Sequence, residues 1–210
     1  MKIRTTAAVM VLTAVACGID LRVDHPFDGN SSGSGHVRLY DANGTWLNAD
    51  GGRVAGNTGI ISAVVDATSK TSIIYFDMDE GRELSSEEAF DAGTWDLAFQ
   101  RYNIATNGGA GGPGNVGVAV LKEKAFDAVT MAPETGYLQD TGETVFNGVE
   151  GGWYYYDLGV HRLLTQGDRT YVVRTGNLHA FKLRMRGYYD DAGTPAMLSF
   201  DYQSLGMLRD

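Results

Sequence analysis

The chain has 210 residues, with 17 Lys or Arg against 26 Asp or Glu, and a formal net charge of −9. This acidic balance argues against a nucleic-acid-binding protein, which needs a basic face to displace phosphate counterions. A single Cys excludes a disulfide framework and a paired-cysteine zinc site. An apolar content of 43% is too high for a disordered chain, and the length predicts about one domain.

Residues 1–16 have the pattern of a secretory signal peptide. Lys2 and Arg4 supply positive charge, and a short apolar run follows them. The run is too short to span a bilayer, which takes about 20 apolar residues. It ends at Cys17 in a sequence similar to a bacterial lipobox. We therefore expect Cys17 to be lipidated and to anchor the protein to a membrane, although an ordinary secretory signal with an incidental Cys is the alternative. Gly18 rather than Asp follows the Cys, which by the enteric sorting rule favours the outer membrane.

The segment 17–36 is expected to be a flexible tether, because it is polar and rich in Gly and Ser. Residues 29–33 carry the letters of a serine nucleophile elbow. That motif requires a strand before it and a helix after it, and neither is predicted. We therefore expect no catalytic Ser here, and we expect His25 and His36 to be solvated.

Residues 37–210 mostly alternate between apolar and polar side chains, which is typical of strands with one buried face. The clearest run is 181–186, where Phe, Leu and Met alternate with Lys and Arg. That strand should have a cationic outer face. The strand-like runs are 72–76, 95–100, 116–121, 153–157, 171–175, 181–186 and 197–202.

Turn signals of the hairpin type occur between these runs. They are Asn43-Gly44, Asp50-Gly51, Gly176-Asn177 and residues 190–193. Only residues 84–90 suggest a helix, where Ser85 and Glu88 have the spacing of a capping box. We therefore predict an all-β fold, with a single antiparallel β-sheet domain over residues 37–210.

Two other segments look like ligand-binding loops. Residues 107–114 contain the glycine spacing of a dinucleotide fingerprint, but that motif needs a helix N-terminus, and a valine-rich strand follows instead. We expect a mobile loop between two strands. The sequence from Asp41 to Gly44 resembles the start of a calcium loop, but its Gly comes too early and no Glu closes it. We expect a turn.

No catalytic arrangement stands out. Four His and one Cys leave few combinations, and no paired-carboxylate, Cys-His or His-rich metal spacing rises above chance. The sequence therefore favours a protein that is not an enzyme.

Several short phrases occur in a characteristic order over roughly residues 70–202. They are Trp95–Tyr102, Thr106–Gly109, Phe126–Thr130 with Ala132-Pro133, Trp153–Tyr156, His161, Tyr171–Thr175, Lys182-Leu183 and Tyr188-Tyr189. Together they resemble the HmuY family of haem-binding bacterial lipoproteins. The resemblance implies a surface or periplasm-facing lipoprotein that captures haem or porphyrin and passes it to an outer-membrane haem transporter.

The resemblance also implies where the iron ligands lie. In the best-known member two His side chains hold the iron from both sides, and some relatives use Met. By its place after the aromatic run, His161 matches one ligand. The second should lie near residues 129–134, where there is no His but there is Met131. A thioether is a legitimate axial ligand of haem iron, so the resemblance implies haem bound by His161 and Met131.

Each candidate has a simpler interpretation. A lone His after an aromatic strand is more often a hydrogen-bonded packing residue, and a Met beside a Pro more often fills a gap in the core. His179 lies in a predicted turn, where we expect it to be exposed. In the run 153–156, which could stack on a porphyrin or a sugar ring, two alternating side chains should be core. The alternative function is a non-catalytic surface module that binds protein or glycan on the same scaffold.

Overall fold

The structure is a computed structural model that describes residues 35–48 and 54–208. Its strands are β1 (Val37–Tyr40), β2 (Ile61–Asp66), β3 (Ile74–Asp77), β4 (Arg82–Leu84), β5 (Leu97–Gln100), β6 (Asn103–Thr106), β7 (Gly117–Lys122), β8 (Tyr154–Asp157), β9 (Arg162–Thr165), β10 (Arg169–Arg174), β11 (His179–Tyr189) and β12 (Pro195–Met207). Within the same ranges the helices are α1 (Ser86–Ala92) and the 3-10 helix η1 (Phe126–Ala128). Neither is long and apolar enough to cross a membrane.

Several sequence expectations lie outside the described residues. They concern the signal peptide, Cys17, His25, the tether up to residue 34 and the turn at Asp50-Gly51.

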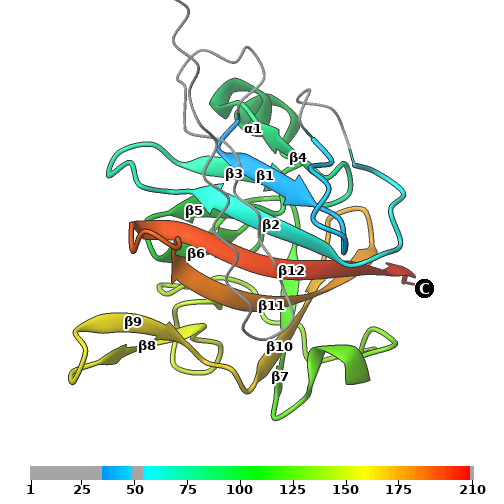
Figure 1. Ribbon diagram of the computed structural model, residues 1–210. Helices are drawn as coiled ribbons and strands as arrows, with labels where there is room; N and C mark the ends of the chain where they lie inside the picture. Colours follow the sequence, from blue (N-terminus) through cyan, green and yellow to red (C-terminus); the bar gives the residue numbers. More distant parts are fainter. Residues whose placement is uncertain (1–34, 49–53, 209–210) are drawn as a thin grey trace, which may run out of the picture. The chain divides into compact units, whose positions relative to one another are not determined.

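The described strands form three antiparallel sheets (Figure 1). The six-stranded sheet has the order β1-β2-β12-β11-β10-β7, the four-stranded sheet the order β4-β3-β5-β6, and β8 pairs with β9 alone. The prediction of a mainly antiparallel β fold is confirmed, but the single sheet that we expected is wrong. Alternation along a strand says which face is buried, and a buried face needs a second layer to cover it.

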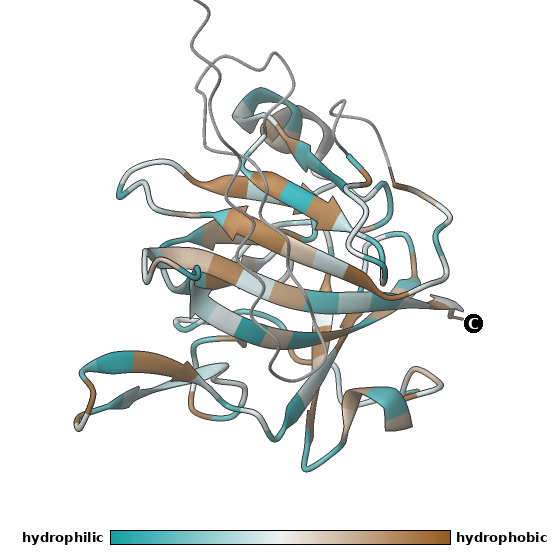
Figure 2. Ribbon diagram, in the orientation of Figure 1, coloured by the Kyte–Doolittle hydropathy of each residue, from teal (hydrophilic) through white to brown (hydrophobic). Residues whose placement is uncertain are grey.

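Aromatic side chains join the six-stranded and four-stranded sheets. Phe76 on β3 and Phe99 on β5 meet Phe200 and Tyr202 on β12, and all four are at most 2% exposed. The ring centroids of Phe99 and Phe200 are 5.7 Å apart, and those of Phe76 and Tyr202 are 5.9 Å apart. Figure 2 shows apolar and polar residues following one another along the strands of the six-stranded sheet, as one buried face requires.

The cationic outer face expected on β11 is covered at one end: Lys182 is buried, whereas Arg184 is half-buried and Arg186 is exposed. Lys182 is only 5% exposed, and its Nζ donates to the carbonyl oxygens of Phe126 (3.1 Å) and Val129 (3.0 Å). The ammonium also lies 4.5 Å from the centre of the Phe126 ring. Burial lowers the pKa of Lys182. Lys182 therefore ties η1, and the segment that leads to Met131, to the sheet.

Helix α1 begins as the capping-box spacing predicts. The Ser85 hydroxyl accepts a hydrogen bond from the Glu88 amide (3.2 Å), and the Glu88 carboxylate accepts one from the Ser85 amide (2.9 Å). The helix ends at Gly93, whose φ of 59° suits a residue without a side chain.

The two loops that resemble ligand sites are connections. The Asp41 carbonyl accepts from the Gly44 amide (2.9 Å), which closes the expected turn. The segment 107–114 joins β6 to β7, as expected, but it is packed rather than loose. The buried Asn107 side chain donates to the Gly93 carbonyl (2.6 Å) and accepts from the Gly114 amide (2.9 Å). A Cβ on Gly109 would lie 2.2 Å from the Asp140 carbonyl oxygen, so close backbone packing explains that glycine.

The aromatic contact between the sheets should dominate the stability of the domain. We predict that Phe200→Ala lowers the free energy of unfolding by about 3–5 kcal/mol, the range for deleting a buried Phe. Phe90→Ala is the matched control, because Phe90 is 81% exposed and surface substitutions usually change stability by no more than about 0.5 kcal/mol. Denaturant titration of both variants measures the difference, and equal losses would contradict the assignment.

Candidate functional site

His161 lies at the tip of the β8–β9 hairpin, directly before β9. The Asp157 carboxylate folds the turn, because its Oδ1 accepts from the amides of Gly159 (2.7 Å) and Val160 (3.1 Å). His161 itself has a φ of 52°, in the left-handed region that few non-glycine residues adopt. The local sequence thus holds the imidazole at the outer end of the hairpin.

The imidazole is exposed and has a partner on one nitrogen. Its Nδ1 lies 3.2 Å from the Tyr156 hydroxyl. When Nδ1 carries the proton and donates to that oxygen, Nε2 presents its lone pair. Metal-binding His residues commonly hold their second ring nitrogen in such a hydrogen bond, which fixes the tautomer and the ring orientation. His161 therefore suits a single coordination bond to a metal held outside the hairpin.

Apolar side chains surround the tip. Tyr155 and Tyr156 on β8 are 45% and 51% exposed, and Leu158 and Val160 in the turn are 76% and 58% exposed. Trp153 is fully buried, and the half-buried Tyr154 packs against the core. The two core members of the run are therefore consecutive, not alternating as expected, because β8 leaves the core after its first residue.

Met131 is 79% exposed, so it does not fill a gap in the core. It follows η1, which Lys182 ties to β11. In Figure 1 the β8–β9 hairpin lies at the lower left and η1, the short green helix, lies at the lower right. The structure thus places both predicted ligands on the surface, on separate segments, and it does not bring them together.

His179 is half-buried and paired, not exposed as expected. Its Nδ1 lies 2.8 Å from Oδ1 of Asp79, in the connection between β3 and β4. The same carboxylate accepts from the Asn177 amide group (2.7 Å) and the Thr175 hydroxyl (3.2 Å). Asp79 therefore links the four-stranded sheet to the β10–β11 turn.

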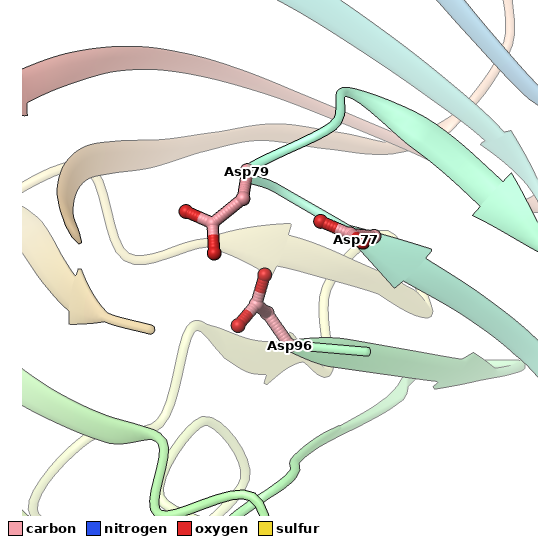
Figure 3. A group of neighbouring side chains, drawn as sticks. All are labelled: Asp77, Asp79 and Asp96. Atoms are coloured by element: carbon pink, nitrogen blue, oxygen red, sulfur yellow. The ribbon is translucent and has the colours of Figure 1, made fainter. Parts of the chain in front are cut away.

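Asp79 belongs to a cluster that the sequence did not reveal. Figure 3 shows its carboxylate facing that of Asp96, with Asp77 beside them, and one oxygen of each lies within 4.8 Å of the others. Asp96 is 2% exposed and its Oδ2 accepts from the Met78 amide (2.8 Å). In the sequence, the only sign of this cluster is the carboxylate of Asp96 within the largely apolar run 95–100.

Protonation explains how these carboxylates coexist. Burial, followed by the negative charge of Asp79, raises the pKa of Asp96 well above its usual range. Burial also raises the pKa of Asp77. A protonated carboxyl group can donate to a neighbouring carboxylate, and protein groups already donate to Asp79 and Asp96. We therefore interpret the cluster as a structural link between the sheets.

Two small cavities flank this cluster. One has a volume of about 180 Å³ and is lined by Asp79, His179 and Tyr202 among others. The second has about 200 Å³ and is lined in part by Asp96 and Asn177. Both fall below the roughly 300–1,000 Å³ of typical small-molecule pockets. Neither is lined by His161 or Met131, so a large planar ligand of His161 would lie against the exposed hairpin.

Comparison with known proteins agrees with the fold. The family model described as HmuY protein matches residues 69–202, well over half of the chain. The structure is similar to the apo form of a HmuY analogue from Tannerella forsythia, with a TM-score of 0.55 and 17% identity, covering 74% of this chain and 100% of that one.

Two further structures have the same fold. Apo PinO from Porphyromonas gingivitis gives a TM-score of 0.51 at 16% identity and covers 72% of this chain and 100% of its own. A HmuY-like protein from Bacteroides vulgatus, to which haem binding has been ascribed, gives a TM-score of 0.50 at 19% identity. The match covers 75% of this chain and 99% of that one. No curated protein matches the chain.

The raised pKa of Asp96 gives a prediction of pH dependence. The folded state holds this proton more tightly than the unfolded state, so ionisation of Asp96 costs stability as pH rises above about 4, the ordinary Asp value. Asn mimics the protonated group. We predict that Asp96→Asn gains stability relative to the unmodified protein as pH rises, by up to about 1.4 kcal/mol per pH unit within the titration range.

Denaturant titrations from about pH 4, near the ordinary Asp pKa, up to about pH 8 measure this difference. Asp191→Asn, at an exposed position, is the control. A stability difference that is constant with pH, or that falls as pH rises, would refute the protonated state of Asp96.

Proposed function

The chain belongs to the HmuY family, and we propose that it binds haem at the β8–β9 hairpin, with His161 as an axial ligand of the iron. The observation that carries this proposal is the exposed imidazole, with Nδ1 3.2 Å from the Tyr156 hydroxyl and Nε2 left to coordinate. Haem binding ascribed to the Bacteroides vulgatus protein of the same fold supports it.

The residues around His161 suit a flat, largely apolar ligand. The exposed rings of Tyr155 and Tyr156 and the aliphatic side chains of Leu158 and Val160 offer contact area that is otherwise left to water. Burial of such surface favours association by roughly 25 cal/mol per Å². Bound haem supplies the iron centre, and the hairpin contributes the imidazole and apolar contact.

We propose Met131 as the second axial ligand. Its exposure leaves the thioether accessible, and a thioether favours ferrous iron, so a His and Met pair raises the reduction potential. Because η1 and the hairpin lie apart in Figure 1, coordination by both residues requires the two segments to approach each other around the haem.

We further propose that the protein is a non-enzymatic carrier on the bacterial cell envelope. In this proposal Cys17, which lies outside the described residues, is lipidated and holds the protein on the outer membrane. The carrier captures haem and passes it to an outer-membrane transporter. The lipobox-like sequence at Cys17 supports the anchor.

Haemin titration of the purified domain, followed at the Soret band, tests the ligands. We predict saturable binding that is tighter under reducing conditions. His161→Ala should abolish the low-spin spectrum, because the imidazole is lost. Met131→Ala should leave a five-coordinate or water-ligated spectrum.

His36→Ala is the matched control for loss of an exposed imidazole. Nδ1 of His36 lies 2.8 Å from Oε1 of Glu83. His36 directly precedes β1, which forms one edge of the six-stranded sheet, whereas β7 forms the other edge. The control should bind haemin as the unmodified domain does. If the unmodified domain shows no saturable Soret shift in either redox state, the haem proposal fails and the protein- or glycan-binding module takes its place.

Replacement of Cys17 tests the anchor. We predict that Cys17→Ser moves the protein from the membrane fraction to the soluble fraction, because the acyl chains that hold it have no attachment point. Stable anchoring takes more than one acyl chain, which bacterial lipoprotein processing provides. Fractionation of cells followed by immunoblotting measures the partition, and unchanged partition would contradict the anchor.

A further inference from the structure

The hairpin that carries His161 has little support of its own. β8 and β9 pair only with each other among the described strands, and a two-stranded hairpin alone is marginally stable in water. The position of His161 therefore depends on the contacts that hold the hairpin to the rest of the domain.

On the β8 side these contacts lie at the base of the hairpin. Trp153, directly before β8, donates from Nε1 to the Tyr102 carbonyl (3.0 Å). The ring of Tyr154 lies 5.6 Å from that of Tyr102. Both contacts are at the end of β8 away from the turn, so they fix the base of the hairpin and not its tip.

On the β9 side one residue makes two contacts. Tyr189, the last residue of β11, accepts a hydrogen bond on its hydroxyl from the Leu163 amide (3.2 Å). The Arg162 guanidinium lies over the Tyr189 ring, 3.9 Å from its centre. Arg162 and Leu163 directly follow His161 in the chain. Tyr189 thus holds the two residues next to the proposed ligand.

We propose that Tyr189 is a positioning residue for His161, an inference that rests on the proposed haem function. Its hydroxyl and ring fix the start of β9, and with it the left-handed backbone of His161. Such a conformation persists only where the surroundings hold it. Tyr189 acts through β9 and does not itself coordinate iron.

Two variants separate the contacts of Tyr189. Tyr189→Phe removes the hydrogen bond and keeps the ring, whereas Tyr189→Leu removes both contacts. Tyr40→Phe is the control, because Tyr40 is a half-buried tyrosine on β1. We expect Tyr189→Phe to bind haemin about three- to tenfold more weakly, the loss of one hydrogen bond, and Tyr189→Leu to bind more weakly still.

The spectrum at saturating haemin distinguishes positioning from direct contact. If Tyr189 acts through His161, saturated Tyr189→Leu should show a spectrum shifted toward that of His161→Ala, and added imidazole should restore the missing coordination. In the haem-free protein, Tyr189→Phe should speed hydrogen exchange at the Leu163 amide. Thermal unfolding of each variant checks that it is folded.

The inference is overturned if haemin binds the unmodified protein through His161 while both Tyr189 variants keep its affinity and spectrum. It is also overturned if affinity falls but the saturated spectrum is unchanged, since Tyr189 would then contact the ligand directly. Absence of haemin binding to the unmodified protein is a distinct result, and it refutes the proposed function together with this inference.

Discussion

Strand β11 is the constraint on which the other parts of the domain depend. Besides pairing with β10 and β12, it makes three attachments through its side chains. His179 at its start binds Asp79 of the four-stranded sheet, Lys182 binds η1, and Tyr189 at its end binds β9. At about 3.4 Å per residue, these attachments are spread over roughly 30 Å. One strand thereby contacts the loop of the second sheet and both segments that carry the proposed ligands.

Much of the fold could be predicted from alternation and turn chemistry alone. Each predicted strand run overlaps a strand, and the capping box at Ser85 begins the only α-helix of the described residues. The division into three sheets could not be predicted, because period 2 gives the buried face of a strand and not its neighbours. The burial of Lys182 was missed for a related reason, since a cation in a strand is ordinarily solvated unless another segment covers it.

The same distinction applies to the candidate site, where local features could be predicted and contacts between distant segments could not. The place of His161 came from a family resemblance, and the exposed hairpin tip is local in origin, because Asp157 folds the turn. Its supports come from far away in sequence. Neither the contacts of Tyr189 with β9 nor the pairing of His179 with Asp79 has a sequence signature, because both depend on how distant strands pack. Candidate ligands are therefore easier to propose from this sequence than the residues that would hold them in place.

The hydrogen bond from Leu163 to Tyr189 has a consequence for self-association. The hairpin is a two-stranded sheet, and open strand edges can pair with strands of other molecules and cause aggregation. By occupying the Leu163 amide, the Tyr189 hydroxyl removes a donor that the outer edge of β9 would otherwise offer. The bond therefore also makes hairpin-to-hairpin joining of neighbouring copies less favourable at high protein concentration.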